Sequence, residues 1–204
     1  MTAEDLRAAV AVSASLAVSG AAVSRHLARG LAPADRWLVG VAAAPFALGL
    51  PVLALRFFGV PLGPSFWLAI FVAAVLVLWP DAPATPAAGP QPVPPAAAGF
   101  PLRTALLLAL GAALLVALPA LAIPFVRMGG DAWVHAGAAI EIASRGLPPQ
   151  DPNFAGIPLY EPWFFAGLVA VLAEAARVSV FHPQALLHAW AAGLLAFASA
   201  RIGW

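Results

Sequence analysis

The chain gathers much of its reactive chemistry in one short stretch, GGDAWVHAGAAIEIASRGLPPQDPNFAGIPLYEPW, which covers residues 129–163. Four of the nine acidic residues lie here, together with an imidazole and the single tyrosine. Carboxylates can take a proton from a hydroxyl nucleophile, stabilise a developing positive charge, or bind a divalent metal. We therefore treat this stretch as the candidate active site.

Each polar residue of the stretch also has an ordinary structural role. Asp131 follows two glycines at the start of a periodic segment, the usual place of a helix N-cap. His135 lies one turn later and could share a proton with Asp131 or bind a metal with it, although such a site needs three or four ligands. Asp151 precedes a proline, as turn residues do. Tyr160 and Glu161 stand where the chain would enter a membrane and could anchor it at the interface.

The spacing of these residues predicts a helix over 131–145. At about 100° per residue, the side chains divide into two arcs. The apolar arc holds Ala132, Trp133, Ala136, Ala139, Ile140 and Ala143. The polar arc holds Asp131, His135, Glu141 and Arg145, with Ile142 as its main apolar member. Such a helix can lie in the membrane interface with Trp133 and Ile140 facing lipid. Gly146 and the two prolines after Leu147 predict its end and an irregular but ordered loop beyond it.

Composition places the whole chain in a membrane. It is 63% hydrophobic and 9% charged, whereas soluble domains carry about 25% charged residues. The net charge of +1 without a basic run argues against a nucleic-acid partner, and the absence of cysteine excludes disulfides and thiolate chemistry. Acidic residues precede the first arginine, so the first apolar run is read as a retained membrane helix instead of a secretory signal.

Six segments are apolar enough for spanning helices of about 20 residues. They cover about 6–27, 37–55, 64–79, 104–126, 162–181, and 183 to near the C-terminus. Glu174 and Arg177 interrupt the fifth and are spaced to form an ion pair at the interface. The sequence therefore predicts an all-α polytopic membrane protein with about six spans, whose partner is the lipid bilayer. An extracytoplasmic amphipathic helix and loop complete this prediction.

A proline-rich segment divides the chain. Residues 81–103 predict an extended Pro/Ala-rich linker between a three-span region, 1–80, and a second membrane region, 104–204. All ten basic residues are arginine, which together with abundant Ala, Gly and Pro is typical of a GC-rich bacterial genome and predicts the bacterial plasma membrane.

The placement of arginine predicts the orientation of the chain. Arg25, Arg29 and Arg36 form the densest basic cluster and predict a cytoplasmic face. The N-terminus and the loop at 127–161 would then lie outside. Arg177 and His182 would lie inside.

The segment 104–190 resembles the GT-C class of membrane glycosyltransferases. The resemblance rests on an aspartate just past a transmembrane helix, an interfacial helix, and the turn PPQDPNFAGIPLY leading into the next span. It implies sugar transfer from a polyprenyl-phosphate donor to an acceptor on the extracytoplasmic face, in the cell envelope. It also implies that Asp131 is catalytic and either acts as general base towards the acceptor hydroxyl or helps to position the acceptor.

The resemblance also implies that further acids of the loop assist with metal or acceptor binding, and Asp151 and Glu161 are the candidates for this substrate-binding role. His135, Tyr160 and Arg145, a cation that could assist a phosphate leaving group, are predicted to bind substrate because they lie in the same loop. Arg127 is a second cation that could assist a phosphate leaving group. The donor sugar, the acceptor and the need for a divalent metal stay open.

Members of this class usually carry many more spans after the first external loop, whereas this chain ends at Trp204 directly after a span. The resemblance thus implies the N-terminal portion of such an enzyme, inactive as a truncated chain. The alternative is a non-enzymatic membrane protein, either a transporter subunit or an assembly partner. Prolines 45 and 51, and 119 and 124, could break helices around a transport site, but no span has an ionisable residue near its centre, where coupling residues are expected.

Overall fold

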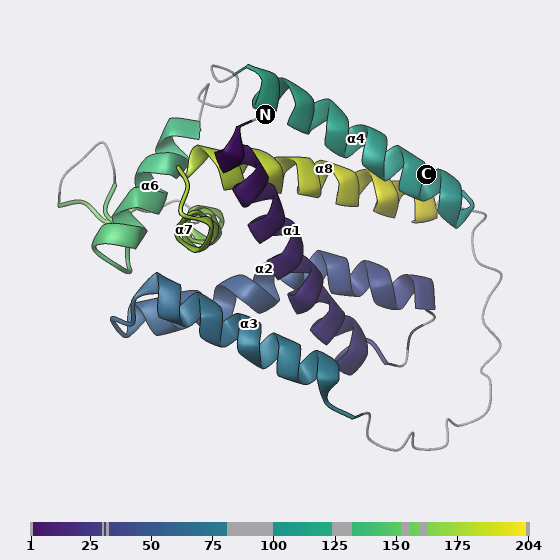
Figure 1. Cartoon of the computed structure of the whole chain (residues 1–204), viewed down its shortest axis with the longest axis horizontal. Helices are drawn as coiled ribbons and strands as arrows, with labels where there is room; N and C mark the ends of the chain where they lie inside the picture. The colour runs from purple at the N-terminus through teal and green to yellow at the C-terminus, as the bar shows by residue number, and fades with distance from the viewer. Residues whose placement is uncertain are drawn as a thin grey trace.

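The computed structural model describes residues 2–29, 31, 33–80, 100–123, 132–151, 156–159 and 163–202. Within these ranges the chain is built from seven α-helices and contains no strand apart from an isolated bridge between Gln150 and Pro158. The helices are α1 (Ala3–His26), α2 (Pro33–Phe57), α3 (Leu62–Leu78), α4 (Leu102–Ala122), α6 (Ala132–Ser144), α7 (Phe164–Ala176) and α8 (Phe181–Ile202) (Figure 1). The predicted all-helical class is confirmed.

Three helical segments of the described chain are long and apolar enough to cross a membrane: Ala3–His26, Asp35–Phe57 and Leu102–Ala120. This is fewer than the six that hydropathy predicted. The fifth predicted span differs most, since α7 has 13 residues and a length of about 20 Å, against about 30 Å for the hydrocarbon core. It ends early because Arg177 adopts a left-handed conformation (φ 54°) that closes the last turn.

Helix α7 is the centre of the core. It packs against α1, α2, α3, α6 and α8, and Val169, Val171 and Leu172 are completely buried. A helix that is apolar on every side needs an apolar environment all round, and here neighbouring helices supply it. The hydropathy of this segment therefore reflects burial in protein.

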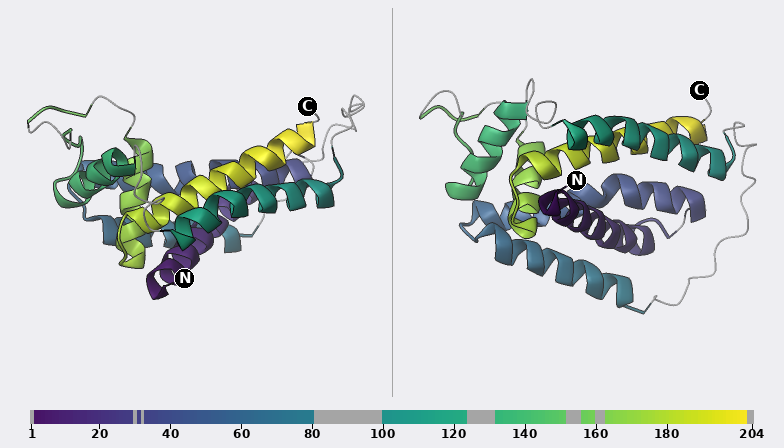
Figure 2. Two further views of the ribbon diagram at one scale, coloured as in Figure 1. Left: turned by 90° about the horizontal axis from the view of Figure 1, so that it is seen from above. Right: turned by 45° about the horizontal axis from the view of Figure 1, so that its top comes forward.

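Small residues allow two pairs of helices to pack closely, α1 with α2 and α4 with α8 (Figures 1 and 2). A Cβ added at Gly40 of α2 would lie 2.5 Å from the Gly20 carbonyl oxygen of α1, and closer still to Ser24 Oγ. A Cβ at Gly193 of α8 would lie 3.1 Å from the Ala109 carbonyl oxygen of α4. Such contacts are typical of membrane helices, where small residues let two backbones approach.

The predicted alternation of faces is wrong at one point. The N-terminus and His182 were expected on opposite sides of the membrane, yet His182 Nδ1 lies 2.8 Å from Asp5 Oδ1. Glu4, Ser144 and Arg177 also line one pocket. The physical reason is the length of α7, which at 13 residues is too short to cross a hydrocarbon core of about 30 Å. Helix α8 then runs beside α4, and the amide of Phe100 before α4 donates to Ala200 O near the end of α8 (2.8 Å).

Candidate functional site

The helix predicted over 131–145 is confirmed as α6, Ala132–Ser144. Its end is also as predicted. The Arg145 amide donates to Glu141 O (2.8 Å) and the Gly146 amide to Ile142 O (3.2 Å). Gly146 has a φ of 105°, which a glycine adopts without strain. Gly146 therefore terminates helix α6, and the irregular part of the candidate loop follows it.

The two faces of α6 differ in part from the prediction. Trp133 and Ile140 point outward as expected, with 59% and 55% of their surface exposed, and their contact with lipid stays a prediction. Ala136 and Ala139 of the same arc are buried instead, and so is Ile142, which the sequence placed among polar neighbours. The reason is that α6 packs on α7, so its small residues face protein.

Several predicted site residues, namely Asp131, Tyr160, Glu161 and Arg127, lie outside the described residues. The first described turn of α6, which directly follows Asp131, is held by a stack of three rings. The His135 ring meets the Phe165 ring edge-on at 5.4 Å, and Phe165 stacks on His188 at 5.0 Å. This stack joins α6, α7 and α8 near the N-terminal end of α6.

Arg145 and Asp151 belong to the other end of α6. Arg145 Nη1 lies 3.4 Å from Glu141 Oε2 and donates to Gln150 Oε1 (3.1 Å). The Asp151 amide donates to Ile157 O (2.8 Å), a contact between described residues of the predicted irregular loop. His135 and Arg145 are ten residues apart on one helix and thus about 15 Å apart along its axis. The structure does not gather these two at one point.

An arginine outside the candidate loop holds the end of α6, and sequence reasoning missed it. Arg56, in the last turn of α2, donates from Nε to Ile142 O (3.0 Å) and from Nη2 to Ala143 O (2.8 Å). The last carbonyls of a helix lack intrahelical donors, and a cation there also suits the helix dipole. The N-terminal helices and the candidate loop are therefore joined directly. No local pattern signals a contact over 86 positions.

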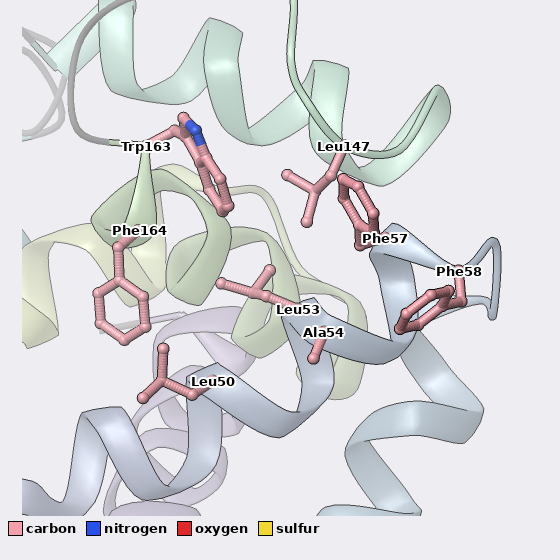
Figure 3. A pocket seen from close by; sticks show the side chains of 8 residues that line it. All are labelled: Leu50, Leu53, Ala54, Phe57, Phe58, Leu147, Trp163 and Phe164. Atoms are coloured by element: carbon pink, nitrogen blue, oxygen red, sulfur yellow. The ribbon is translucent and has the colours of Figure 1, made fainter.

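Between α2 and the candidate loop lies an apolar groove of about 550 Å³ (Figure 3). Its walls come from the end of α2 and from both flanks of the loop. The lining side chains are Leu50, Leu53, Ala54, Phe57, Phe58, Leu147, Trp163 and Phe164. Almost every lining atom is carbon, so the groove suits a hydrocarbon ligand.

A second polar cluster lies at the N-terminus, where the sequence gave no warning of a site. Asp5 is only 2% exposed; its Oδ2 accepts from the Thr2 amide (2.7 Å) and its Oδ1 lies 2.8 Å from His182 Nδ1. His182 Nε2 lies 3.1 Å from Glu4 Oε2. An imidazole donates from both nitrogens only when protonated, so both contacts are hydrogen bonds together only for charged His182. The capping box formed by Thr2 and Asp5 can be recognised in the sequence. His182, which contacts Asp5, lies 177 positions further along the chain.

The Glu4 side chain also lines a polar pocket of about 610 Å³. Glu174, Arg177, Ser144 and Ser179 line it too, among apolar neighbours. The predicted pairing of Glu174 with Arg177 is not found, since no salt bridge of 4.0 Å or less joins these two described residues. Arg177 turns away from helical geometry as the C-cap of α7, which removes the spacing on which that pairing depended.

Within the described ranges, no three His, Asp or Glu side chains are grouped so that they could hold a metal ion. Fold and composition define the class: an all-helical protein with three candidate membrane-spanning helices in its described part. Comparison with protein-family models, with curated proteins and with solved structures found no match.

Proposed function

We propose that the chain is a membrane glycosyltransferase, or the N-terminal portion of one, in the bacterial plasma membrane. It would transfer a sugar from a polyprenyl-phosphate donor to an extracytoplasmic acceptor. In this proposal α3 and α8 cross the bilayer together with the three candidate spans, and α7 enters it without crossing. The alternative of a non-enzymatic membrane protein has no observation of its own in its favour.

The observation that carries the proposal is the apolar groove beside the candidate loop. Leu147 and Trp163 at the flanks of the loop form one wall, and the end of α2 forms the other (Figure 3). An isoprenoid chain in this groove would hold its phosphate at the level of the loop. Asp131 would then take the proton from the acceptor hydroxyl as the glycosidic bond forms. Arg145, two residues before Leu147 of the groove wall, is the described cation of the candidate loop and suits the departing phosphate.

A groove-filling variant tests this assignment. Ala54→Trp places an indole in the groove, and Ala54 is exposed enough to accept it. The Michaelis constant for the lipid-linked donor is expected to rise about tenfold or more, because each CH₂ kept out of the groove loses about 0.8 kcal/mol. The turnover number should change little, since the lost binding is the same in ground and transition states.

Transfer kinetics in proteoliposomes, with radiolabelled polyprenyl-phosphate sugar, measure this effect. Leu115→Trp on the exposed face of α4 is the matched control and should keep the parental Michaelis constant. An unchanged Michaelis constant for Ala54→Trp would show that the groove is not part of the donor site.

The orientation has a separate test. We expect the 127–161 loop outside the cell and the linker at 81–103 inside, because the basic cluster at Arg25, Arg29 and Arg36 favours the cytoplasm. Single cysteines at Gln91 and Gln150 of this cysteine-free chain can be treated with a membrane-impermeant thiol reagent in intact cells. Position 150 should react and position 91 should not. The opposite pattern would reverse the orientation.

A further inference from the structure

The polar pocket of about 610 Å³ beside the start of α1 contains charges of both signs. It lies where α1 meets the ends of α6 and α7, and Glu4, Glu174 and Arg177 supply its charges. Most of the remaining lining is apolar and includes Ile140, Ala143 and Val178. A ligand that fills this pocket therefore needs a charged part and an apolar part.

Glu174 and Arg177 line the pocket without pairing with each other. Among the described residues, no salt bridge of 4.0 Å or less reaches either side chain. A Cβ added at Gly63, the second residue of α3, would lie 3.9 Å from Glu174 Oε1. The carboxylate thus lies beside the start of α3, where the helix dipole favours an anion. Arg177 has the left-handed conformation of the α7 C-cap (φ 54°), which removes it from helical spacing. One anion and one cation are therefore held separately at the same pocket.

The third charge, Glu4, already has partners. Its Oε2 lies 3.1 Å from His182 Nε2, and its Oε1 lies 4.0 Å from Arg7 Nη2. These contacts offset the charge of Glu4. Glu174 and Arg177 are therefore the two groups that a ligand with both signs of charge could bridge.

An exposed apolar side chain continues the pocket onto the outer face of α6. Ile140 lines the pocket and is 55% exposed, and it belongs to the face of α6 that we expect to contact lipid. Helix α6 packs directly on α7, so this face lies close to the charged end of the pocket. Charged groups beside an exposed apolar face are typical of the membrane interface. The ligand that fits this arrangement is an amphiphile.

We propose that this pocket binds one phosphatidylethanolamine-type lipid, whose headgroup joins a phosphate to a primary ammonium group. The ammonium would donate to Glu174 and the phosphate would accept from Arg177, both as charge-assisted hydrogen bonds. One acyl chain would lie against Ile140 and Val178. A lipid with a purely anionic headgroup brings no cation to Glu174, and a choline headgroup carries methyl groups in place of the N–H donors. The inference is independent of the proposed glycosyltransferase activity.

Native mass spectrometry of the full chain, released from a neutral detergent, tests the site. The protein is titrated separately with phosphatidylethanolamine, phosphatidylcholine and phosphatidylglycerol of the same acyl chains. Phosphatidylethanolamine should bind most tightly, with one preferred molecule per chain. Arg177→Asn should weaken its binding about fivefold, the effect of one cation beside an anionic group at a membrane surface.

The variant Glu174→Gln tests the ammonium contact. Phosphatidylethanolamine binding should weaken about threefold to fivefold, the upper range for one exposed ion pair. Phosphatidylcholine binding should change less, since a trimethylammonium group donates no hydrogen bond. Phosphatidylglycerol binding should not weaken, because the variant removes a charge that repels this lipid.

Matched variants separate this site from general attraction and from loss of folding. Asparagine adopts the left-handed conformation more readily than most residues, so Arg177→Asn should keep the end of α7. Arg177→Lys keeps the cation and should keep most of the affinity. Ala143→Trp should weaken all three lipids by filling the pocket. Arg103→Gln and Asp35→Asn each remove one charge outside the pocket lining and should change no affinity.

Parental phosphatidylethanolamine affinity in either Glu174→Gln or Arg177→Asn would overturn the proposal. So would equal binding of phosphatidylethanolamine and phosphatidylglycerol by the parent, or a loss of the same size in Arg103→Gln. Displacement of the bound lipid by glycerophosphoethanolamine at the same concentration would also overturn it, since that would show a headgroup site without a surface for the acyl chain.

Discussion

Replacing Asp131 with asparagine is expected to lower sugar transfer about 10²–10⁴-fold, which is the usual contribution of a general base. An acceptor hydroxyl is a poor nucleophile until it loses its proton, and the asparagine amide cannot accept one. The helix that follows position 131 is present as α6, and asparagine caps a helix about as well as aspartate. The variant should therefore fold and insert like the parent.

The comparison depends on matched variants assayed in membranes at equal expression. Asp131→Ala also removes an N-cap, which costs about 1 kcal/mol, and so mixes folding with chemistry. Asp35→Asn is a better control, because Asp35 lies in the first turn of a helix, α2, outside the candidate loop. It should transfer sugar at the parental rate. If Asp131→Asn does too, Asp131 is only a helix cap.

Helix positions could be predicted from the sequence because they depend on local signals. The end of α6 follows from Gly146 and the prolines after it, and the all-helical class follows from long apolar runs. The length of α7 could not be predicted, since hydropathy does not distinguish a segment buried among helices from one immersed in lipid. The left-handed conformation of Arg177 decides where α7 ends. A glycine at position 177 would have predicted this helix end, whereas an arginine does not.

The faces of α6 show where periodicity stops being informative. Opposed arcs predicted the outward position of Trp133 and Ile140, which is confirmed. They did not predict that Ile142 is the buried contact, because the choice between lipid and protein for an apolar side chain depends on what packs beside it. Only the tertiary position of α7 settles that choice. The catalytic assignment of Asp131 and the substrate-binding assignments of Tyr160 and Glu161 stay predictions, since these residues lie outside the described ranges.

The long-range polar contacts could not be predicted from the sequence. Arg56 on the end of α6 and His182 on Asp5 join segments 86 and 177 positions apart. Each of these residues looked ordinary in its local context. Asp5 belongs to the capping box at the start of α1, and His182 lies in the first turn of α8. The pairing has a measurable consequence because one of its members is buried.

Removing the His182 ring is expected to destabilise the fold by about 3–5 kcal/mol, the usual cost of removing one member of a buried polar pair. His182→Leu introduces an apolar side chain of similar size and removes the contact with Asp5, which is 2% exposed, while the Thr2 contacts of the α1 cap stay. Glu4→Gln should cost no more than about 1 kcal/mol, because the Glu4 side chain is 50% exposed and exposed pairs contribute little.

Equilibrium unfolding in mixed micelles, followed by circular dichroism, measures these free energies. The double variant Asp5→Leu with His182→Leu makes the prediction specific. Replacing both members of a buried pair by apolar side chains is often neutral. The double variant should therefore have a higher free energy of unfolding than His182→Leu alone. The lost capping contact of Asp5 reduces this gain by about 1 kcal/mol. A double variant whose loss equals the sum of the two single losses would mean that Asp5 and His182 act independently. The contact between the start of α1 and the start of α8 would then contribute nothing to the fold.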